Sequence, residues 1–138
     1  MSDASWALQS AVYARLKADA RVKAALGDPA RIFDSPPEDA VFPYLTLGES
    51  RVGDWAGVPG GQEHELRLYA YSQYAGRREV KRIISAVYDA IHETRFDVPG
   101  FHLVNMRYVF ADVLRRREPD TYQGVMRYRA VTQPLVTA

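Results

Sequence analysis

The side chains that most often carry chemistry are sparse in this sequence and do not fall into a catalytic or metal-binding spacing. Its three histidines, His64, His92 and His102, lie on a predicted strand, at a predicted helix end and on another predicted strand. They lack the short, regular spacing with which histidines bind one metal ion together. The chain has no cysteine, which excludes thiolate metal sites and disulfide bonds. We therefore expect no metal centre and no cofactor.

Three glutamates offer a different kind of site, for acid–base chemistry. Glu49, Glu63 and Glu65 lie on two strands that the sequence predicts to pair, so their carboxylates can converge. Strand carboxylates are more often solvated or paired with arginines, here Arg51 and Arg67. A small hydrolase or ligand-binding domain that uses these carboxylates stays an alternative. The rest of the sequence, which lacks a nucleophile motif and a phosphate loop before a helix, predicts a protein that is not an enzyme.

The charge balance argues against a dedicated nucleic-acid binder. Eighteen lysines and arginines oppose 17 aspartates and glutamates, a net charge of +1. Arg115-Arg116-Arg117 is the basic cluster, and Glu118 and Asp120 follow it. No apolar run approaches the roughly 20 residues of a membrane helix, and the N-terminal residues do not resemble a secretory signal. We expect a protein that is made and folds in the cytoplasm and contacts no membrane.

The elements that position these side chains centre on a long hairpin between Phe42 and Tyr74. Two segments alternate apolar and polar residues with period two, and the segment between them, 53–62, is rich in turn formers. One side of the hairpin is expected to carry leucines and alanine and to be buried: Leu45, Leu47, Leu66, Leu68 and Ala70. The other side is polar but aromatic.

Two main helices are predicted to cover the leucine side. The first carries the stripe Leu8, Ala11, Val12 and Leu16, and a short helical turn over 19–26 follows it. The second runs from Arg77 to about Thr94. Its stripe consists of Val80, Ile83, Ile84, Val87, Tyr88 and Ile91.

A second long hairpin completes the predicted fold. Residues 102–114 are expected to alternate with Val104, Met106, Tyr108 and Phe110 on one side, and residues 122–132 with Met126, Tyr128 and Ala130. Residues 115–123 are expected to join them as an exposed polar arm. The sequence thus predicts one α+β domain over residues 1–138, with a mostly antiparallel sheet, long hairpins and two main helices packed on one face.

Two groups of residues suggest an interface with another protein. Trp55 and Val58 lie on the Gly-rich arm of the first hairpin, where a large apolar ring is costly unless it packs against something. The polar sheet face and the second arm combine tyrosine with arginine, a composition typical of interfaces. The candidate interface residues on them are Arg67, Tyr69, Tyr71, Arg107, Arg116, Arg127 and Arg129. The residues alone leave open that Trp55 folds back onto its own domain and that the arginines are simply solvated.

Segments along nearly the whole chain resemble the tail-completion family of long-tailed phages. The family includes tail terminators and tail-to-head joining proteins, and gene transfer agents carry members of it. The resemblance rests on segments 7–16, 31–34 and 42–49, which read ALQSAVYARL, RIFD and FPYLTLGE, and on segments 63–66, 78–80 and 125–130. These positions define a fold and are not catalytic signatures.

The resemblance implies a structural virion protein. Such proteins form a ring, usually a homo-hexamer, that caps the tail tube, ends its polymerisation and joins the tail to the head connector. The implied partners are other copies of the chain, the tail tube protein and a head–tail connector or adaptor, and DNA passes through the channel without specific binding. The implied location is the virion tail at the head–tail joint, after assembly in the bacterial host cytoplasm. A head-side completion or adaptor protein that does not limit tail length stays an alternative.

Overall fold

The computed structural model describes residues 4–74, 76–117 and 120–135. In chain order its elements are α1 (Ala4–Ala18), α2 (Ala20–Leu26), β1 (Ile32–Phe33), β2 (Tyr44–Asp54), β3 (Gln62–Ser72), α3 (Arg78–Ile91), β4 (Phe101–Arg117) and β5 (Asp120–Pro134). None of the helices in the described segments is long and apolar enough to cross a membrane.

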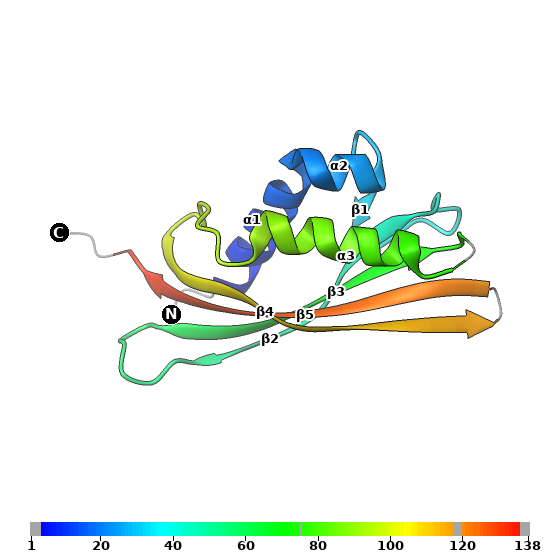
Figure 1. The fold of residues 1–138 in the computed structure, drawn as a ribbon. Coiled ribbons are helices and arrows are strands. Elements are labelled where there is room, and N and C mark those ends of the chain that lie inside the picture. The colour runs from blue at the N-terminus through cyan, green and yellow to red at the C-terminus, as the bar shows by residue number, and fades with distance from the viewer. Residues whose placement is uncertain (1–3, 75, 118–119, 136–138) are drawn as a thin grey trace.

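The five strands form one sheet in the order β1-β2-β3-β5-β4. All neighbouring strands are antiparallel except β1, which pairs in parallel with residues 45 and 46 of β2. The helices cover one face of the sheet and leave the other face free (Figure 1). This arrangement confirms the predicted α+β fold with a mostly antiparallel sheet.

The core lies between the helices and the covered face of the sheet. The predicted stripe of α1 and the leucine side of the first hairpin are buried as expected. In α3 the stripe residues Val80, Ile83, Val87 and Ile91 are fully buried, and each contributes roughly 1.5–3 kcal/mol of transfer free energy. The prediction for Tyr88 was wrong, because it is 38% exposed and stacks on the His92 ring at 4.4 Å.

A side-chain cap fixes the start of α2. The Asp19 carboxylate accepts hydrogen bonds from the backbone N–H groups of Arg21 at 2.8 Å and Val22 at 3.1 Å. These N–H groups have no acceptor within the helix, so the cap replaces bonds they would otherwise make to water. The Arg21 guanidinium also pairs with Asp19 at 2.9 Å, and this bond, with the cap, lowers the pKa of Asp19.

β4 does not alternate as the sequence predicts, because two bulges interrupt it. Val104 and Val109 are each an extra residue relative to β5. Met106 and Tyr108, which lie between the bulges, face the helices as expected. Phe110, beyond the second bulge, lies opposite Arg127 and is exposed on the free face, so its predicted place beside Tyr108 was wrong. The buried residue that comes before the first bulge is Leu103.

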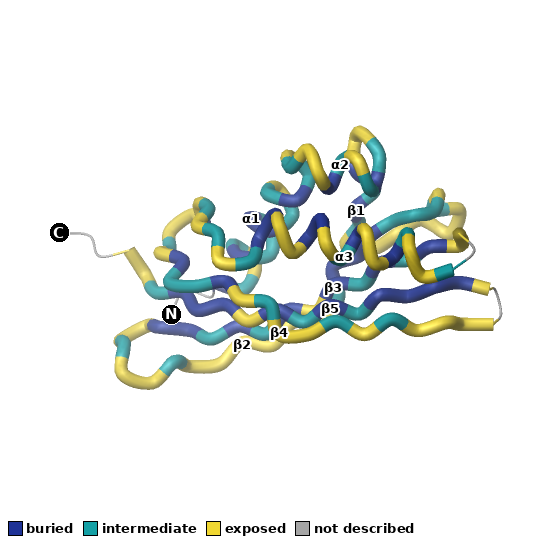
Figure 2. The backbone as a smooth tube through the Cα atoms, viewed as in Figure 1, coloured by how far each residue is buried: buried dark blue, intermediate teal, exposed yellow. Residues whose placement is uncertain are grey.

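The two hairpins point away from each other. The β2–β3 hairpin extends past the helices at one end of the sheet, and the β4–β5 hairpin extends at the opposite end (Figure 1). The predicted polar arm over 115–123 is mostly strand, because β4 continues to Arg117 and β5 starts at Asp120. Residues 118–119 lie outside the described part of the chain. β5 is largely buried, whereas the outer half of β4 is exposed (Figure 2).

Candidate interaction surfaces

The sheet face opposite the helices, hereafter the free face, gathers most of the predicted interface residues. Strand register places seven of them there, on three neighbouring strands. They are Arg67, Tyr69, Tyr71, Arg107, Arg116, Arg127 and Arg129. No helix covers this face in the described part of the chain, so the side chains form an outer surface (Figure 1).

Ion pairs between β3 and β5 organise the middle of the free face. Arg127 pairs with Glu65, and Arg129 pairs with Glu63 at 2.5 Å. The expected partners Arg51 and Arg67 are therefore not the ones that these glutamates use. The hydrogen bond from Arg129 lowers the pKa of Glu63. A carboxyl whose pKa is lowered is a poor general acid at neutral pH, so this geometry does not favour the hydrolase alternative.

Tyr69 is held over the backbone of the neighbouring strand. Its hydroxyl donates a hydrogen bond to Glu49 at 2.6 Å, and this bond, with burial, raises the pKa of Tyr69. The ring lies directly over Gly48, where a Cβ atom would overlap it. The side chain is therefore fixed in position, which reduces the entropy that a contact with another protein would cost.

A second ordered row crosses the free face nearer the β4–β5 turn. The Tyr44 and Tyr71 rings stack with their centroids 5.0 Å apart. Gln123 donates to the Tyr71 hydroxyl at 3.2 Å and accepts from Arg116 at 3.0 Å. The row connects four strands, from β2 through β3 and β5 to β4, and presents aromatic and charged groups together.

Trp55 and Val58 fold back onto their own hairpin arm. The backbone N–H of Trp55 donates to the Gly61 carbonyl at 2.9 Å. A Cβ atom at Gly61 would lie 3.3 Å from the indole of Trp55 and 3.1 Å from Cβ of Val58, so both side chains pack over this glycine. Each keeps part of its surface exposed. The arm is thus compact, with a partly exposed apolar tip.

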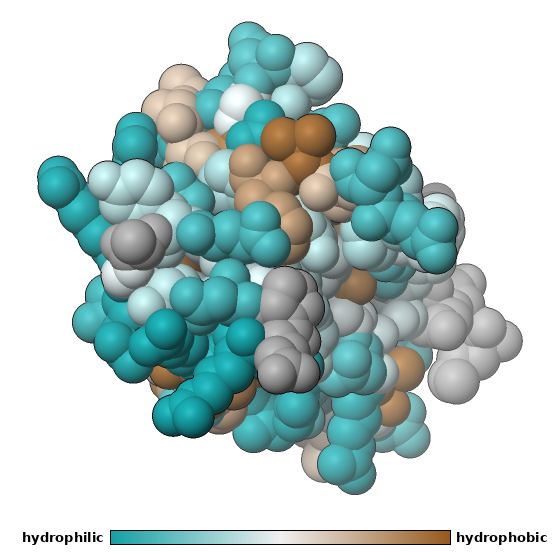
Figure 3. All heavy atoms as spheres, turned by 90° about the vertical axis from the view of Figure 1, so that its right-hand side faces the viewer, coloured by the Kyte–Doolittle hydropathy of each residue, from teal (hydrophilic) through white to brown (hydrophobic). Residues whose placement is uncertain are grey.

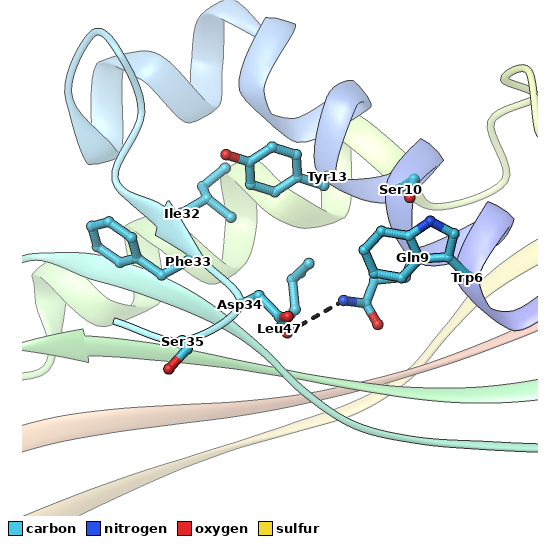
Figure 4. A pocket seen from close by; sticks show the side chains of 9 residues that line it. All are labelled: Trp6, Gln9, Ser10, Tyr13, Ile32, Phe33, Asp34, Ser35 and Leu47. Carbon is cyan, nitrogen blue, oxygen red and sulfur yellow. Dashed lines mark hydrogen bonds between the residues drawn. The ribbon is translucent and has the colours of Figure 1, made fainter. Parts of the chain in front are cut away.

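The sequence interpretation missed a groove between α1 and the β1 edge of the sheet. The groove has a volume of about 460 Å³ and is lined by Trp6, Gln9, Ser10 and Tyr13 of α1, with Ile32, Phe33 and Leu47 beneath them (Figure 4). Gln9 spans it with a hydrogen bond to Asp34 at 3.3 Å. The signal was available, because the four α1 residues follow the i, i+3, i+4, i+7 spacing of one helix face.

The outer side of β4 forms a further exposed surface. Val109 is 49% exposed and Leu114 is 48% exposed, both unusually open for apolar residues on a strand. The Phe110 ring lies under the Arg127 guanidinium at 5.6 Å. Near the turn, Arg115 pairs with Asp120 at 2.9 Å. Hydrophilic residues dominate the end of the molecule that carries this turn (Figure 3).

The histidines lie apart from one another. His64 is buried and its Nε2 lies 2.9 Å from the Thr132 hydroxyl, while His92 Nδ1 accepts from the Tyr108 backbone N–H at 3.0 Å. His102 is exposed on β4. Within the described residues, no group of three or more histidines and carboxylates is placed to hold a metal ion.

Comparison with protein families gives one match that spans most of the chain. Residues 10–133 match the family described as tail completion protein gp17. No curated protein matches the chain.

Two solved structures are similar over nearly the whole length. A chain of the structure named "Virion of native gene transfer agent (GTA) particle" is 28% identical, with a TM-score of 0.85, and the match covers 96% of this chain and 98% of that one. The structure of bacteriophage SPP1 gp17 protein is 20% identical, with a TM-score of 0.60, and the match covers 97% and 92%. The second likeness concerns the fold alone.

Proposed function

Because the chain belongs to the tail completion protein gp17 family, we propose that it forms a ring, a homo-hexamer, on the end of the tail tube. The ring ends polymerisation of the tube and joins the tail to the head connector. Family membership makes the chain a structural protein of the virion tail, and we propose that it has no enzymatic activity. The proposed contacts are with its own copies, the tail tube protein and the connector or adaptor, while DNA passes through the channel without specific binding.

The observation that carries this proposal is the match to a chain of a gene transfer agent virion over 96% of the sequence at a TM-score of 0.85. A ring that closes needs a different surface on each side of every subunit. The sheet supports such contacts because its two edges differ. β1 covers only a short part of one edge, and β4 forms the whole of the other.

We assign the tube and connector contacts to surfaces that remain exposed when copies meet edge to edge. The two hairpin arms point in opposite directions, so each can reach a different neighbour of the ring (Figure 1). Trp55 and Val58 are the proposed contacts on the β2–β3 arm. The seven tyrosines and arginines of the free face are the remaining proposed interface residues, for contacts with another copy as well as with the tube or connector, and Arg67 and Arg107 lie outside the Glu63 and Glu65 ion pairs.

The proposal is tested by deleting the gene and examining the particles by electron microscopy. We expect overlong tubes of variable length, separate from DNA-filled heads. Restoring the wild-type gene should restore both length and joining. As a matched control, a gene that carries Lys81→Ala, on the solvent side of α3, should restore both equally well.

Tails of normal length in the deletion would contradict the capping role. If those tails were unattached, the head-side completion role would replace it. If they were fully attached to heads, both structural roles would be lost.

A further inference from the structure

One edge of the sheet is unfinished beside the groove. β1 pairs with residues 45 and 46 of β2 and then ends, so β2 has no described neighbour on that side from Leu47 to Asp54. Leu47 forms part of the groove floor at this point. Trp6 stands at the groove with 69% of its surface exposed, the most open of the large apolar residues in the described segments.

The opposite edge of the sheet, formed by β4, offers exposed apolar side chains that could enter the groove. β4 pairs with β5 alone among the described strands. On its other side the Met106 carbonyl accepts from the Glu93 N–H at 2.7 Å and the Tyr108 N–H donates to His92 Nδ1 at 3.0 Å, so the open edge is the part of β4 beyond Val109. Beyond the bulge at Val109, β4 pairs regularly with β5 up to the turn. Val109 and Leu114 are exposed in this stretch, and they offer apolar side chains to a groove that is lined mainly by apolar and aromatic residues.

The charges around the two edges are opposite in sign. The segment next to the groove, 34–39, reads DSPPED and holds three carboxylates with no basic residue, all exposed. The outer half of β4, residues 107–117, carries four arginines and a single aspartate. Unlike charges on two surfaces speed their encounter and fix their orientation, while like charges would oppose it.

We propose that the groove between α1 and β1 receives the outer side of β4, around Val109 and Leu114, from a second copy of this chain. The inference deepens the proposed ring and depends on it. Each copy then uses its groove for one neighbour and its β4 edge for the other, the unlike pair of surfaces that a closed ring requires. Trp6 provides the large apolar contact, and the carboxylates of 34–39 meet the arginines of β4.

Introduced cysteines test this contact directly, because the natural chain has none. Ser10→Cys places a thiol in the groove and Val109→Cys places one on β4. Particles assembled with the double variant are treated with a short bis-maleimide, denatured and separated by size. We expect a ladder of covalent multimers that ends at one ring. Each single variant should stay monomeric, and so should the control pair Lys81→Cys with Val109→Cys.

Two further variants sharpen the result. Trp6→Glu in the double-cysteine background should lower the yield of multimers about tenfold or more, because it removes the large apolar contact. The variant should still fold, because the exposed ring can be replaced without disturbing the core. Raising the salt concentration during assembly should lower the yield too, since the paired surfaces carry opposite charge.

The outcomes separate this contact from the ring itself. Particles that carry several copies per tail but give no ladder would overturn the groove contact and leave the ring intact. Dimers from Ser10→Cys alone would also overturn it, since they mean that two grooves face each other. Tails that carry at most one copy of the chain would instead refute the proposed function.

Discussion

Gly48 and Tyr69 form a contact on the free face that a larger residue at position 48 would destroy. A Cβ atom there would overlap Cε2 of the Tyr69 ring and lie 2.8 Å from its Cδ2. The same side chain donates to Glu49 at 2.6 Å. Gly48→Ala should therefore displace the ring and break the hydrogen bond to Glu49.

The size of the effect follows from three contributions. A hydrogen bond of this kind has a net value of about 1 kcal/mol when water competes for both groups, as it does for the exposed Glu49. Loss of the ring's packing on the next strand adds roughly 0.5 kcal/mol. Gly48 has no positive φ, so alanine also restricts the unfolded chain and returns roughly 0.4–1 kcal/mol. Gly48→Ala alone should thus lower the free energy of unfolding by only about 0.5–1 kcal/mol.

A double-mutant cycle isolates the contact more sharply than the single variant. Tyr69→Phe removes the hydroxyl and should cost about 1 kcal/mol in the natural chain but close to nothing beside Gly48→Ala. The free energies are measured by urea denaturation of the four proteins. Gly53→Ala is the matched control, because a Cβ atom at Gly53 meets nothing within 4 Å and should leave the cost of Tyr69→Phe unchanged.

An equal cost of Tyr69→Phe in both backgrounds would refute the reasoning. The pKa of Tyr69 gives a second measurement of whether the ring has moved. The bond to Glu49 and burial raise this pKa above its ordinary value of 10.0. In Gly48→Ala the pKa of Tyr69 should move back toward that value in an NMR titration. If it stays raised, the ring has not moved.

Three other predictions concern the helices and the first arm. Asp19→Ala should lower the free energy of unfolding by about 1 kcal/mol while Asp19→Asn keeps the cap. Because the folded-state pKa of Asp19 is lowered, the contribution of its carboxylate to the free energy of unfolding is complete above the ordinary pKa of 3.8 and is lost as pH falls through the lowered pKa. Asp19→Asn should therefore lose less stability than the natural chain when the pH is lowered. Ile83→Ala should cost about 2–5 kcal/mol and the half-buried Ile84→Ala clearly less, by denaturant titration; equal costs would contradict the packing of α3. Trp55→Ala should reduce the fraction of heads that carry tails in electron micrographs, and unchanged ring assembly and joining would remove the assignment of this arm to a partner.

The fold was predictable where local patterns and tertiary packing agree. The period of α3 and the alternation of β3 both identify buried residues, because each element packs one side only on the core. Tyr88 did not follow this pattern, because its ring packs against His92 and the edge of Tyr108 and still leaves 38% of the residue exposed. β4 did not follow the alternation either, because a bulge has no signature in the side chains of a single strand. Its position depends on pairing with β5.

The candidate surfaces were predictable in composition but not in arrangement. Tyrosine and arginine marked the free face, since strand alternation alone separates its residues from the core. The arginines that pair with Glu63 and Glu65 were not predictable. β5 is far away in sequence, and its register with β3 decides which arginine lies near each glutamate. The α1 side of the groove at Trp6 could be recognised from its helical spacing. The other side could not, because it depends on the position of β1, a strand of two residues that pairs beyond a long loop.

The two bulges of β4 also indicate where the length of this chain can change during evolution. Val104 and Val109 have no counterpart on β5, so deleting either one leaves every other residue opposite its present partner. A deletion elsewhere in the strand would move the following side chains to the wrong face. Single-residue gaps between homologous sequences should therefore concentrate at these two valines, and strands that have lost them should twist less.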